Sequence, residues 1–336
     1  MMSIGPYKIY GRQLGKGSFS TVYEAKKSDK NVAMKLIKDD YIKNFKSEKY
    51  ILSKLIQKHE NIIKLMDIYE KVVNENKYYV IIYPYYEYNL FDYIDKNTLK
   101  VNQVKFITKC LIKGLIELNN NKILHADLKP ANILLKVNNT NIINVVICDF
   151  SNSLEYSYAE INDYSENPIC TSWYRPPEQI INNTYTKTKG DIWSLGCVLF
   201  EMVCKKFLFD CSPESKDCKN LVLLHNFQSL IGSIPYVDNK YFTSDKILKP
   251  LTLIKENLYI LEKWSLSVFF LVNLNKLYNK QEALCFSNYF LMIKKCLQFV
   301  PDERINLEDL LKHDWFNEIL IVKTNYEMKR KADEIN

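Results

Sequence analysis

The middle of the chain holds three polar side chains with complementary chemistry. Asp127, Lys129 and Asn132 stand two and three residues apart in a stretch flanked by short apolar runs, which predicts a loop between buried elements. Asp127 can accept a proton, and Lys129 can neutralise the charge of a phosphoryl oxygen. The amide oxygen of Asn132 is a ligand that a hard cation such as Mg²⁺ accepts.

A second candidate metal ligand follows in Asp149-Phe150-Ser151, directly behind the strand-like run Val145–Cys148. Its carboxylate, together with the amide of Asn132, could hold a cation beside the proton acceptor Asp127. The order and spacing of these groups are specific, and they indicate metal-assisted chemistry on a phosphoryl group.

The beginning of the chain offers partners for a phosphate chain. Gly15 and Gly17 would let a hairpin backbone approach phosphates without Cβ clashes, although an ordinary hairpin explains two glycines equally well. Lys35 shares a strand face with Ala33, and Glu48 on the next predicted helix is a plausible ion-pair partner. A strand lysine is more often simply exposed, so this pair gains meaning only together with the later motifs.

Two groups of elements must position these residues. In the first part, apolar and polar residues alternate as in a β-meander, and one helix is expected at Ile42–Leu55. The expected strands are Tyr7–Leu14, Thr21–Lys26, Asn31–Ile37, Lys64–Tyr69 and Tyr78–Tyr83. After Pro84 the period becomes helical, over Gln103–Asn119, Lys189–Val203, Leu221–Ile231, Ala283–Phe299 and Leu307–Leu311. The Asn-rich stretch Asn138–Asn144 is expected to be a surface loop. We therefore expect an α+β protein with a small β-rich lobe, a larger helical lobe and a basic tail (1–83, 84–318 and 319–336).

Composition narrows the class of protein. The 336 residues are 47% hydrophobic and 25% charged, which excludes disorder, and the apolar runs are far shorter than a membrane span of about 20 residues. Nine cysteines without paired spacing and an N-terminus without signal-peptide features predict an intracellular protein, in the cytoplasm, the nucleus or both. The net charge of +7 is spread along the chain, so direct nucleic-acid binding is not expected.

The ordered motifs resemble those of the eukaryotic protein kinases over about residues 10–316. Trp173–Glu178 matches the end of their activation segment, and Asp191–Gly196 matches the start of the helix that follows it. Arg304 looks like the late arginine that pairs with the Glu178 position. The resemblance implies the two-lobed kinase fold, with ATP and Mg²⁺ as cofactors.

Within the kinases, several details resemble the CMGC group and, inside it, the SR-protein kinases. They include Arg175 after a tyrosine, Gly-x-Phe-Ser-Thr-Val in the glycine loop and the absence of arginine before Asp127, where Ala126 stands. The segments 207–209, 230–235, 263–266 and 282–283 follow the same family's order. The related Clk/LAMMER kinases come second, because His225–Leu230 replaces their signature. The long spacer usual in SR-protein kinases is absent here, which suggests a stripped-down member.

The resemblance assigns each motif residue a role. Lys35 would hold the α- and β-phosphates, steadied by Glu48, while Asp149 and Asn132 hold Mg²⁺. Asp127 would accept or orient the proton of the substrate hydroxyl, and Lys129 would stabilise the γ-phosphate. The other nucleotide-binding positions are Leu14, Gly15, Lys16, Gly17, Val22, Ala33, the gatekeeper Tyr83, the hinge residues Pro84 and Tyr86, Asn89 and Leu134. Pro84 lacks an N–H, but adenine is expected to use its carbonyl and the N–H of Tyr86.

The resemblance also implies partners and regulation. Lys129 and Thr171 favour serine or threonine acceptors, and the substrates are expected to be proteins, possibly Arg/Ser-rich splicing factors. Because no arginine precedes Asp127, we expect activity without phosphorylation of the activation loop. The protein is also expected to be a monomer. The rival interpretation is a pseudokinase scaffold, since Ser151 and Ala126 replace common kinase residues. Ser151 is expected to restrict flipping of Asp149.

Overall fold

The computed structural model describes residues 3–55, 59–73, 75–159, 170–182, 184–211, 219–232 and 265–317. The predicted basic tail, residues 319–336, lies outside the described residues, as do residues 233–235 and 263–264.

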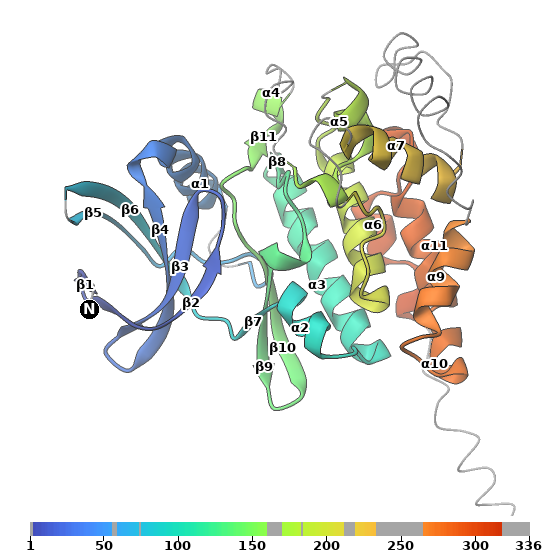
Figure 1. Ribbon diagram of the computed structural model, residues 1–336, viewed down its shortest axis with the longest axis horizontal. Coiled ribbons are helices and arrows are strands. Elements are labelled where there is room, and N and C mark those ends of the chain that lie inside the picture. The colour runs from blue at the N-terminus through green and yellow to red at the C-terminus, as the bar shows by residue number, and fades with distance from the viewer. Residues whose placement is uncertain are drawn as a thin grey trace, which may run out of the picture.

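The N-terminal lobe is a six-stranded antiparallel sheet with one long helix (Figure 1). Its strands, in the order β1-β2-β3-β4-β6-β5, are β1 (Ser3–Ile4), β2 (Tyr7–Lys16), β3 (Ser20–Lys27), β4 (Lys30–Lys38), β6 (Asn76–Pro84) and β5 (Asp67–Val73), and the helix is α1 (Ile42–Lys54). Five strands are predicted correctly in kind, but β5 begins three residues later than expected and extends to Val73. The two-residue β1 is too short to show a period, so the prediction misses it.

Alternation along the central strands decides which residues meet the helix. In β4, Val32, Met34 and Leu36 pack into a small cluster on one face of the sheet. Lys35 and Ile37 therefore point to the opposite face, where Ile37 joins Phe45 and Leu52 of α1 in the main core. The same alternation that buries this face carries Lys35 to the helix.

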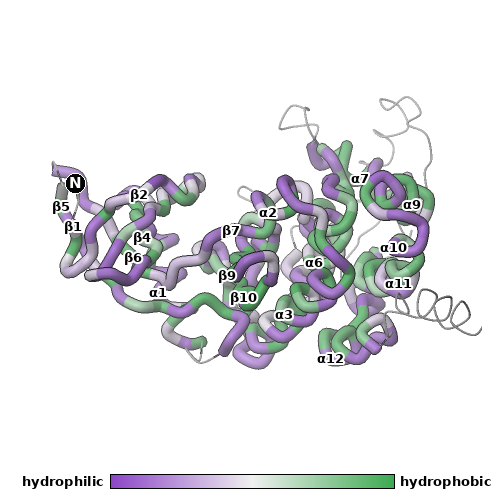
Figure 2. Tube along the Cα trace, turned by 90° about the horizontal axis from the view of Figure 1, so that it is seen from below, coloured by the Kyte–Doolittle hydropathy of each residue, from purple (hydrophilic) through white to green (hydrophobic). Residues whose placement is uncertain are grey.

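The C-terminal lobe is mainly helical, as predicted. Its helices are α2 (Leu90–Lys96), α3 (Val101–Asn120), α4 (Tyr156–Ala159), α5 (Pro177–Asn182), α6 (Thr188–Cys204), α7 (Lys219–Leu230), α9 (Leu266–Leu274), α10 (Lys280–Leu284), α11 (Ser287–Cys296) and α12 (Leu307–Leu311). Every residue of α6 from Gly190 to Cys204 is buried, so this helix forms the centre of the lobe (Figure 1). Green and purple segments alternate along most elements in Figure 2, as expected where each has one buried and one exposed face.

Two expectations in this lobe are wrong. The predicted helix Ala283–Phe299 is two helices, α10 and α11, because buried Phe286 anchors a turn between them. The Asn-rich stretch expected as a loop is largely strand, since β9 (Ile133–Asn138) and β10 (Asn141–Ile147) form a hairpin. Asparagine is rare in strands, but cross-strand pairing at the edge of this hairpin overrides that preference.

The two lobes meet at the predicted catalytic residues. Strand β6 leads through a short connection into β7 (Tyr88–Asn89), which pairs with β9, and a two-stranded sheet joins β8 (Ile123–Leu124) to β11 (Leu154–Glu155). The predicted catalytic loop lies between β8 and β9, and Asp149 follows β10. Among the residues that the structure describes, no helix combines the length and apolar character needed to cross a membrane.

Candidate active site

A chain of three charged side chains joins the two lobes. The Lys35 Nζ lies 2.7 Å from Glu48 Oε2 and 3.0 Å from Oε1, and it also lies 2.8 Å from Asp149 Oδ1. Lys35 and Glu48 are buried, whereas 35% of the Asp149 side chain is exposed. The predicted pair is therefore present, and the lysine also reaches the predicted metal ligand in the other lobe.

Two hydroxyl groups complete this chain at its ends. The Tyr83 hydroxyl donates to Glu48 Oε1 at 2.7 Å, and the Ser151 hydroxyl donates to Asp149 Oδ1 at 2.8 Å. Neither bond is predicted from the sequence, because each depends on how a strand or loop is placed in three dimensions.

Electrostatic interactions keep Lys35 and Asp149 charged, whereas burial raises the pKa of Glu48 above its ordinary value. Burial alone would lower the pKa of Lys35, but the carboxylates of Asp149 and Glu48 raise it above its ordinary value. Burial likewise opposes ionisation of Asp149, but the charge of Lys35 and the bonds from Lys35 and Ser151 lower the pKa of this carboxyl. At neutral pH the site thus presents an ammonium and an ionised carboxylate to a ligand.

The predicted catalytic loop brings Asp127, Lys129 and Thr171 into one cluster. Lys129 Nζ donates to Asp127 Oδ2 at 2.7 Å and to Thr171 Oγ1 at 2.9 Å, while the Thr171 hydroxyl donates to Asp127 Oδ1 at 2.6 Å. The Asn132 amide donates to the Asp127 carbonyl at 2.9 Å. Asp127 is thereby held in one orientation by groups from the loop and from the activation segment.

Asp191, at the start of α6, fixes the backbone of this loop from below. Its carboxylate accepts the N–H groups of His125 at 2.8 Å and Ala126 at 3.0 Å. Burial raises the pKa of Asp191 to about 6, so the carboxylate depends on these donors to stay ionised. The sequence marks Asp191 only as part of a motif, and the structure shows its positioning role.

The glycine loop connects β2 and β3 with open space around it. Gly15 pairs with Val22 across the hairpin, and the Gly17 N–H donates to the Ser20 carbonyl at 2.9 Å. A Cβ atom added to Gly15 would meet nothing within 4 Å, so packing inside the protein does not require glycine there. The open surface fits a loop that lies over a phosphate chain.

The predicted adenine-binding positions come from both lobes. Ala33 pairs with Tyr83 across β4 and β6, and Pro84 follows at the end of β6. Leu134 on β9 belongs to the other lobe and packs against the main core, as Ala33 does. Apolar side chains from two lobes can enclose a flat ring between them.

Four further predicted residues lie around this position. Leu14 and Lys16 belong to β2, beside the glycine loop. The Tyr86 hydroxyl donates to Asn144 at 2.9 Å, which directs its ring toward the β9–β10 hairpin. Asn89 caps α2, since its amide oxygen accepts the Asp92 N–H at 2.8 Å, and its contact with a nucleotide stays a prediction.

Asn132 and Asp149 fit a magnesium ion. The hydrogen bonds described above engage Oδ1 of Asp149 and Nδ2 of Asn132, which leaves the carboxylate Oδ2 and the amide oxygen as candidate ligands. Mg²⁺ takes hard oxygen ligands and is often held by one or two protein groups together with substrate phosphates.

A buried ion pair ties Glu178 of α5 to Arg304, which lies between α11 and α12. Arg304 donates from Nη1 and Nη2 to the two carboxylate oxygens of Glu178, at 2.8 and 2.6 Å, and both side chains are fully buried. The predicted pairing is present in the structure.

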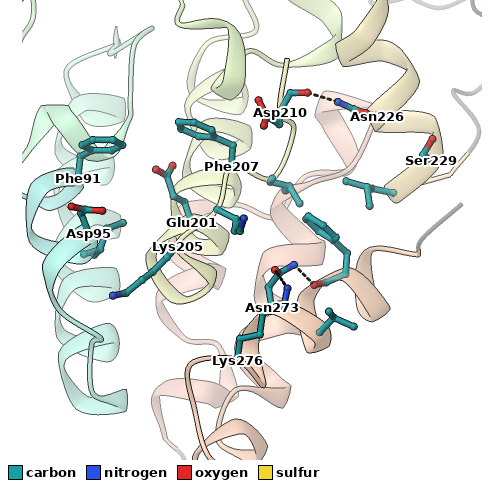
Figure 3. A pocket seen from close by; sticks show the side chains of 16 residues that line it. Phe91, Asp95, Glu201, Lys205, Phe207, Asp210, Asn226, Ser229, Asn273 and Lys276 are labelled. Atoms are coloured by element: carbon teal, nitrogen blue, oxygen red, sulfur yellow. Dashed lines mark hydrogen bonds between the residues drawn. The ribbon is translucent and has the colours of Figure 1, made fainter. Parts of the chain in front are cut away.

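A cavity of about 740 Å³ opens in the C-terminal lobe between α2, α6, α7 and α9 (Figure 3). Its lining is largely apolar but includes the carboxylates of Asp95, Glu201 and Asp210 and the ammonium groups of three lysines. Glu201 accepts the Tyr174 hydroxyl at 2.6 Å, and burial raises its pKa to about 7. Sequence reasoning did not single out Glu201, because it sits within an otherwise apolar helix.

Comparison with known sequences agrees with this geometry. The sequence model described as "Protein kinase domain" matches residues 9–316. Curated relatives include a probable serine/threonine-protein kinase, glkA, of Dictyostelium discoideum (32% identical over 61% of this chain and 41% of the relative). Cyclin-dependent kinase G1 of Arabidopsis thaliana is 27% identical over 93% of this chain and 49% of its own length. A probable cell division protein kinase of Encephalitozoon cuniculi is 34% identical over 62% and 75%. The chain thus spans less than half the length of the first two relatives.

Proposed function

We propose that this chain, which belongs to the protein kinase family, transfers the γ-phosphate of ATP to serine or threonine residues of proteins. The observation that carries the proposal is that the Lys35 ammonium donates hydrogen bonds to both Glu48 and Asp149. Phosphoryl transfer needs mainly positioning and neutralisation of charge, and this arrangement provides both.

Each polar group has a role in this reaction. Lys35 binds the α- and β-phosphates and is kept in place by Glu48, while Asp149 and Asn132 would hold Mg²⁺. When bound, the metal neutralises charge on the phosphate oxygens. Asp127 orients the acceptor hydroxyl and takes its proton, and Lys129 stabilises charge on the transferred group.

The nucleotide lies between the lobes in this proposal. Val22 and Ala33 cover the adenine from above, and Leu134 supports it from below. The Pro84 carbonyl accepts from adenine and the Tyr86 N–H donates to it, while the backbone from Leu14 to Gly17, including Gly15 and Lys16, covers the phosphates. Tyr83 closes the space behind the ring.

The pseudokinase alternative rests on Ser151 and Ala126. Neither replacement removes a group that performs a chemical step, and Ser151 adds a bond to Asp149. The test is Mg²⁺-dependent incorporation of labelled phosphate from ATP into a protein substrate. Incorporation should disappear in Asp149→Ala and persist in Asp29→Ala, an exposed turn variant. Absence of incorporation by the unaltered chain would instead support a scaffold.

We also propose that activity needs no phosphate on the activation segment. Ala126 stands where many kinases carry an arginine, and it packs with Leu124 and Tyr185 in a small apolar cluster. Leu154 and Tyr156, at the start of the segment, pack against the same cluster. An apolar contact thus attaches the segment to the catalytic loop without a charged group.

Helix α1 is likewise attached by the chain itself. Asn44 and Ser47 donate to the carbonyls of Ser151 and Ser153, and Tyr50 and Lys54 bind the carboxylate of Glu155. These donors recur at helical spacing along one face of the helix. They support an active arrangement without a partner subunit, although the names of two relatives contain "cyclin-dependent".

The purified chain, treated with phosphatase and free of other proteins, tests this second proposal. We expect activity within about twofold of the untreated sample. Loss of activity after treatment, or activity only after addition of a cyclin-type partner, would overturn the proposal while leaving the kinase assignment intact.

Arg/Ser-rich proteins are the proposed substrates. Asp95 and Asp210 place two carboxylates in the cavity of Figure 3, where they could bind arginine side chains in competition with the three lysines that line the same cavity. The names of the relatives favour a second candidate, a kinase of the cyclin-dependent type. A peptide array with Arg-Ser repeats, Ser-Pro sites and acidic sites separates the two. Preference for Ser-Pro peptides would reject the Arg/Ser assignment.

A further inference from the structure

The hydroxyl of Tyr83 is buried and directed at the partner of the active-site lysine. It donates to Glu48 Oε1 at 2.7 Å, and the same oxygen also accepts from Lys35 at 3.0 Å. The exposed fractions of Tyr83, Glu48 and Lys35 are 7%, 0% and 5%. Water therefore has little access to replace any of these bonds.

The sheet presents Tyr83 and Lys35 side by side. Ala33 pairs with Tyr83 and Lys35 pairs with Ile81, so the tyrosine and the lysine are diagonal neighbours on one face of β4 and β6. Two adjacent strands thus hold one carboxylate of α1 from two directions. A lysine alone could follow the carboxylate on its long flexible stem, whereas the rigid tyrosine ring fixes its position.

We propose that Tyr83 is a positioning residue for phosphoryl transfer, whose hydroxyl holds Glu48, and through it Lys35, in register with the phosphates of ATP. Movement of α1 away from the sheet would leave both the tyrosine hydroxyl and the lysine ammonium buried without this acceptor. Buried polar groups without partners are costly, so the hydroxyl favours the arrangement in which α1 is engaged. The inference rests on the proposed kinase activity.

The variant Tyr83→Phe tests the role of the hydroxyl, because it keeps the ring and its packing. We expect kcat to fall about tenfold, as the loss of a hydrogen bond to a charged group predicts, with KM for ATP changed less than twofold. The KM should hold because adenine is proposed to bind the backbone of residues 84–86, which the variant leaves unaltered.

Tyr79→Phe is the matched control on the same strand. Tyr79 is also buried, and its hydroxyl donates to a carboxylate, Asp39, at 2.9 Å, but this bond lies outside the site. We expect its kcat to stay within twofold of the unaltered enzyme. Equal loss of kcat in both variants would show a general structural effect and overturn the proposal.

A double-mutant cycle with Glu48→Met, which removes the acceptor of the Tyr83 hydroxyl, identifies the route of the effect. If Tyr83 acts through Glu48, Tyr83→Phe should lower kcat less than about twofold once Glu48→Met is present. A full tenfold loss in that background would overturn the proposal, as would an unchanged kcat in the single variant. An inactive unaltered chain would instead contradict the proposed function, so the two failures are distinguishable.

Discussion

Replacement of Arg304 by methionine should destabilise the C-terminal lobe severely, because it leaves the buried carboxylate of Glu178 without its cation. Removal of one partner of a buried pair costs about 3–5 kcal/mol. The Thr186 hydroxyl still donates to Glu178 at 2.6 Å, which favours the lower end, about 3 kcal/mol. For a unit of some 150–250 residues this corresponds to a melting temperature about 6–12 °C lower.

Thermal unfolding of the purified chain measures this effect, with Lys113→Met as control. Lys113 and Glu60 form a pair at 3.3 Å with 43% and 69% of their side chains exposed, so its loss should shift the midpoint by no more than about 2 °C. Arg304→Met combined with Glu178→Gln should recover part of the loss, since no charge then stays buried. A midpoint for Arg304→Met equal to that of the control would refute the reasoning.

Three other predictions concern the site. Burial raises the pKa of Glu201 from 4.5 to about 7, so the native state binds this proton more tightly than the unfolded chain does. Lowering the pH from 8 to 5 should therefore stabilise the unaltered protein relative to Glu201→Gln by about 2–3 kcal/mol. Urea unfolding at the two pH values measures this difference, and parallel pH dependence in both proteins would contradict it. Ser151→Gly removes a hydrogen-bond donor to Asp149 and adds backbone freedom, so the Mg²⁺ concentration for half-maximal activity should rise about threefold or more. An unchanged Mg²⁺ titration would show that the Ser151 hydroxyl does not help Asp149 to bind the metal. Thr171→Ala removes a shared partner of Asp127 and Lys129 and should lower kcat at least about tenfold, whereas Thr171→Ser should retain most of the activity. Steady-state kinetics with a peptide substrate measures this, and an unchanged kcat in Thr171→Ala would show that the bridge is dispensable.

The sequence predicts the parts of the site that depend on order along the chain. Lys35 and Glu48 were expected to pair because strand alternation and the following helix bring them to one face, and the structure confirms the contact. Spacing alone could not reveal the contact of the Tyr83 hydroxyl, since it depends on the register between β4 and β6, whose paired residues lie 40 to 52 positions apart in the chain. Asp191 illustrates the same limit, because the backbone groups that it binds lie 65 and 66 residues away.

The fold shows a similar division. Long periodic helices such as α3 and α6 were predicted nearly to their ends, since many residues contribute to each period. The break between α10 and α11 follows from burial of Phe286 against the rest of the lobe. The sequence does not reveal this break, because the helical period of apolar residues continues through Phe286. Local pattern decides the type of an element, and tertiary packing decides where it ends.

The apolar cluster around Ala126 has a consequence for the conditions under which the kinase works. The attraction between a phosphate and an arginine weakens as salt is added, because dissolved ions screen charges; the screening length is about 8 Å at physiological ionic strength. Contacts between Leu154, Tyr156 and Tyr185 carry no charge and weaken instead on cooling, because burial of apolar surface is driven by entropy near room temperature. The contact of Leu154 and Tyr156 with this cluster should therefore persist in concentrated salt and weaken in the cold.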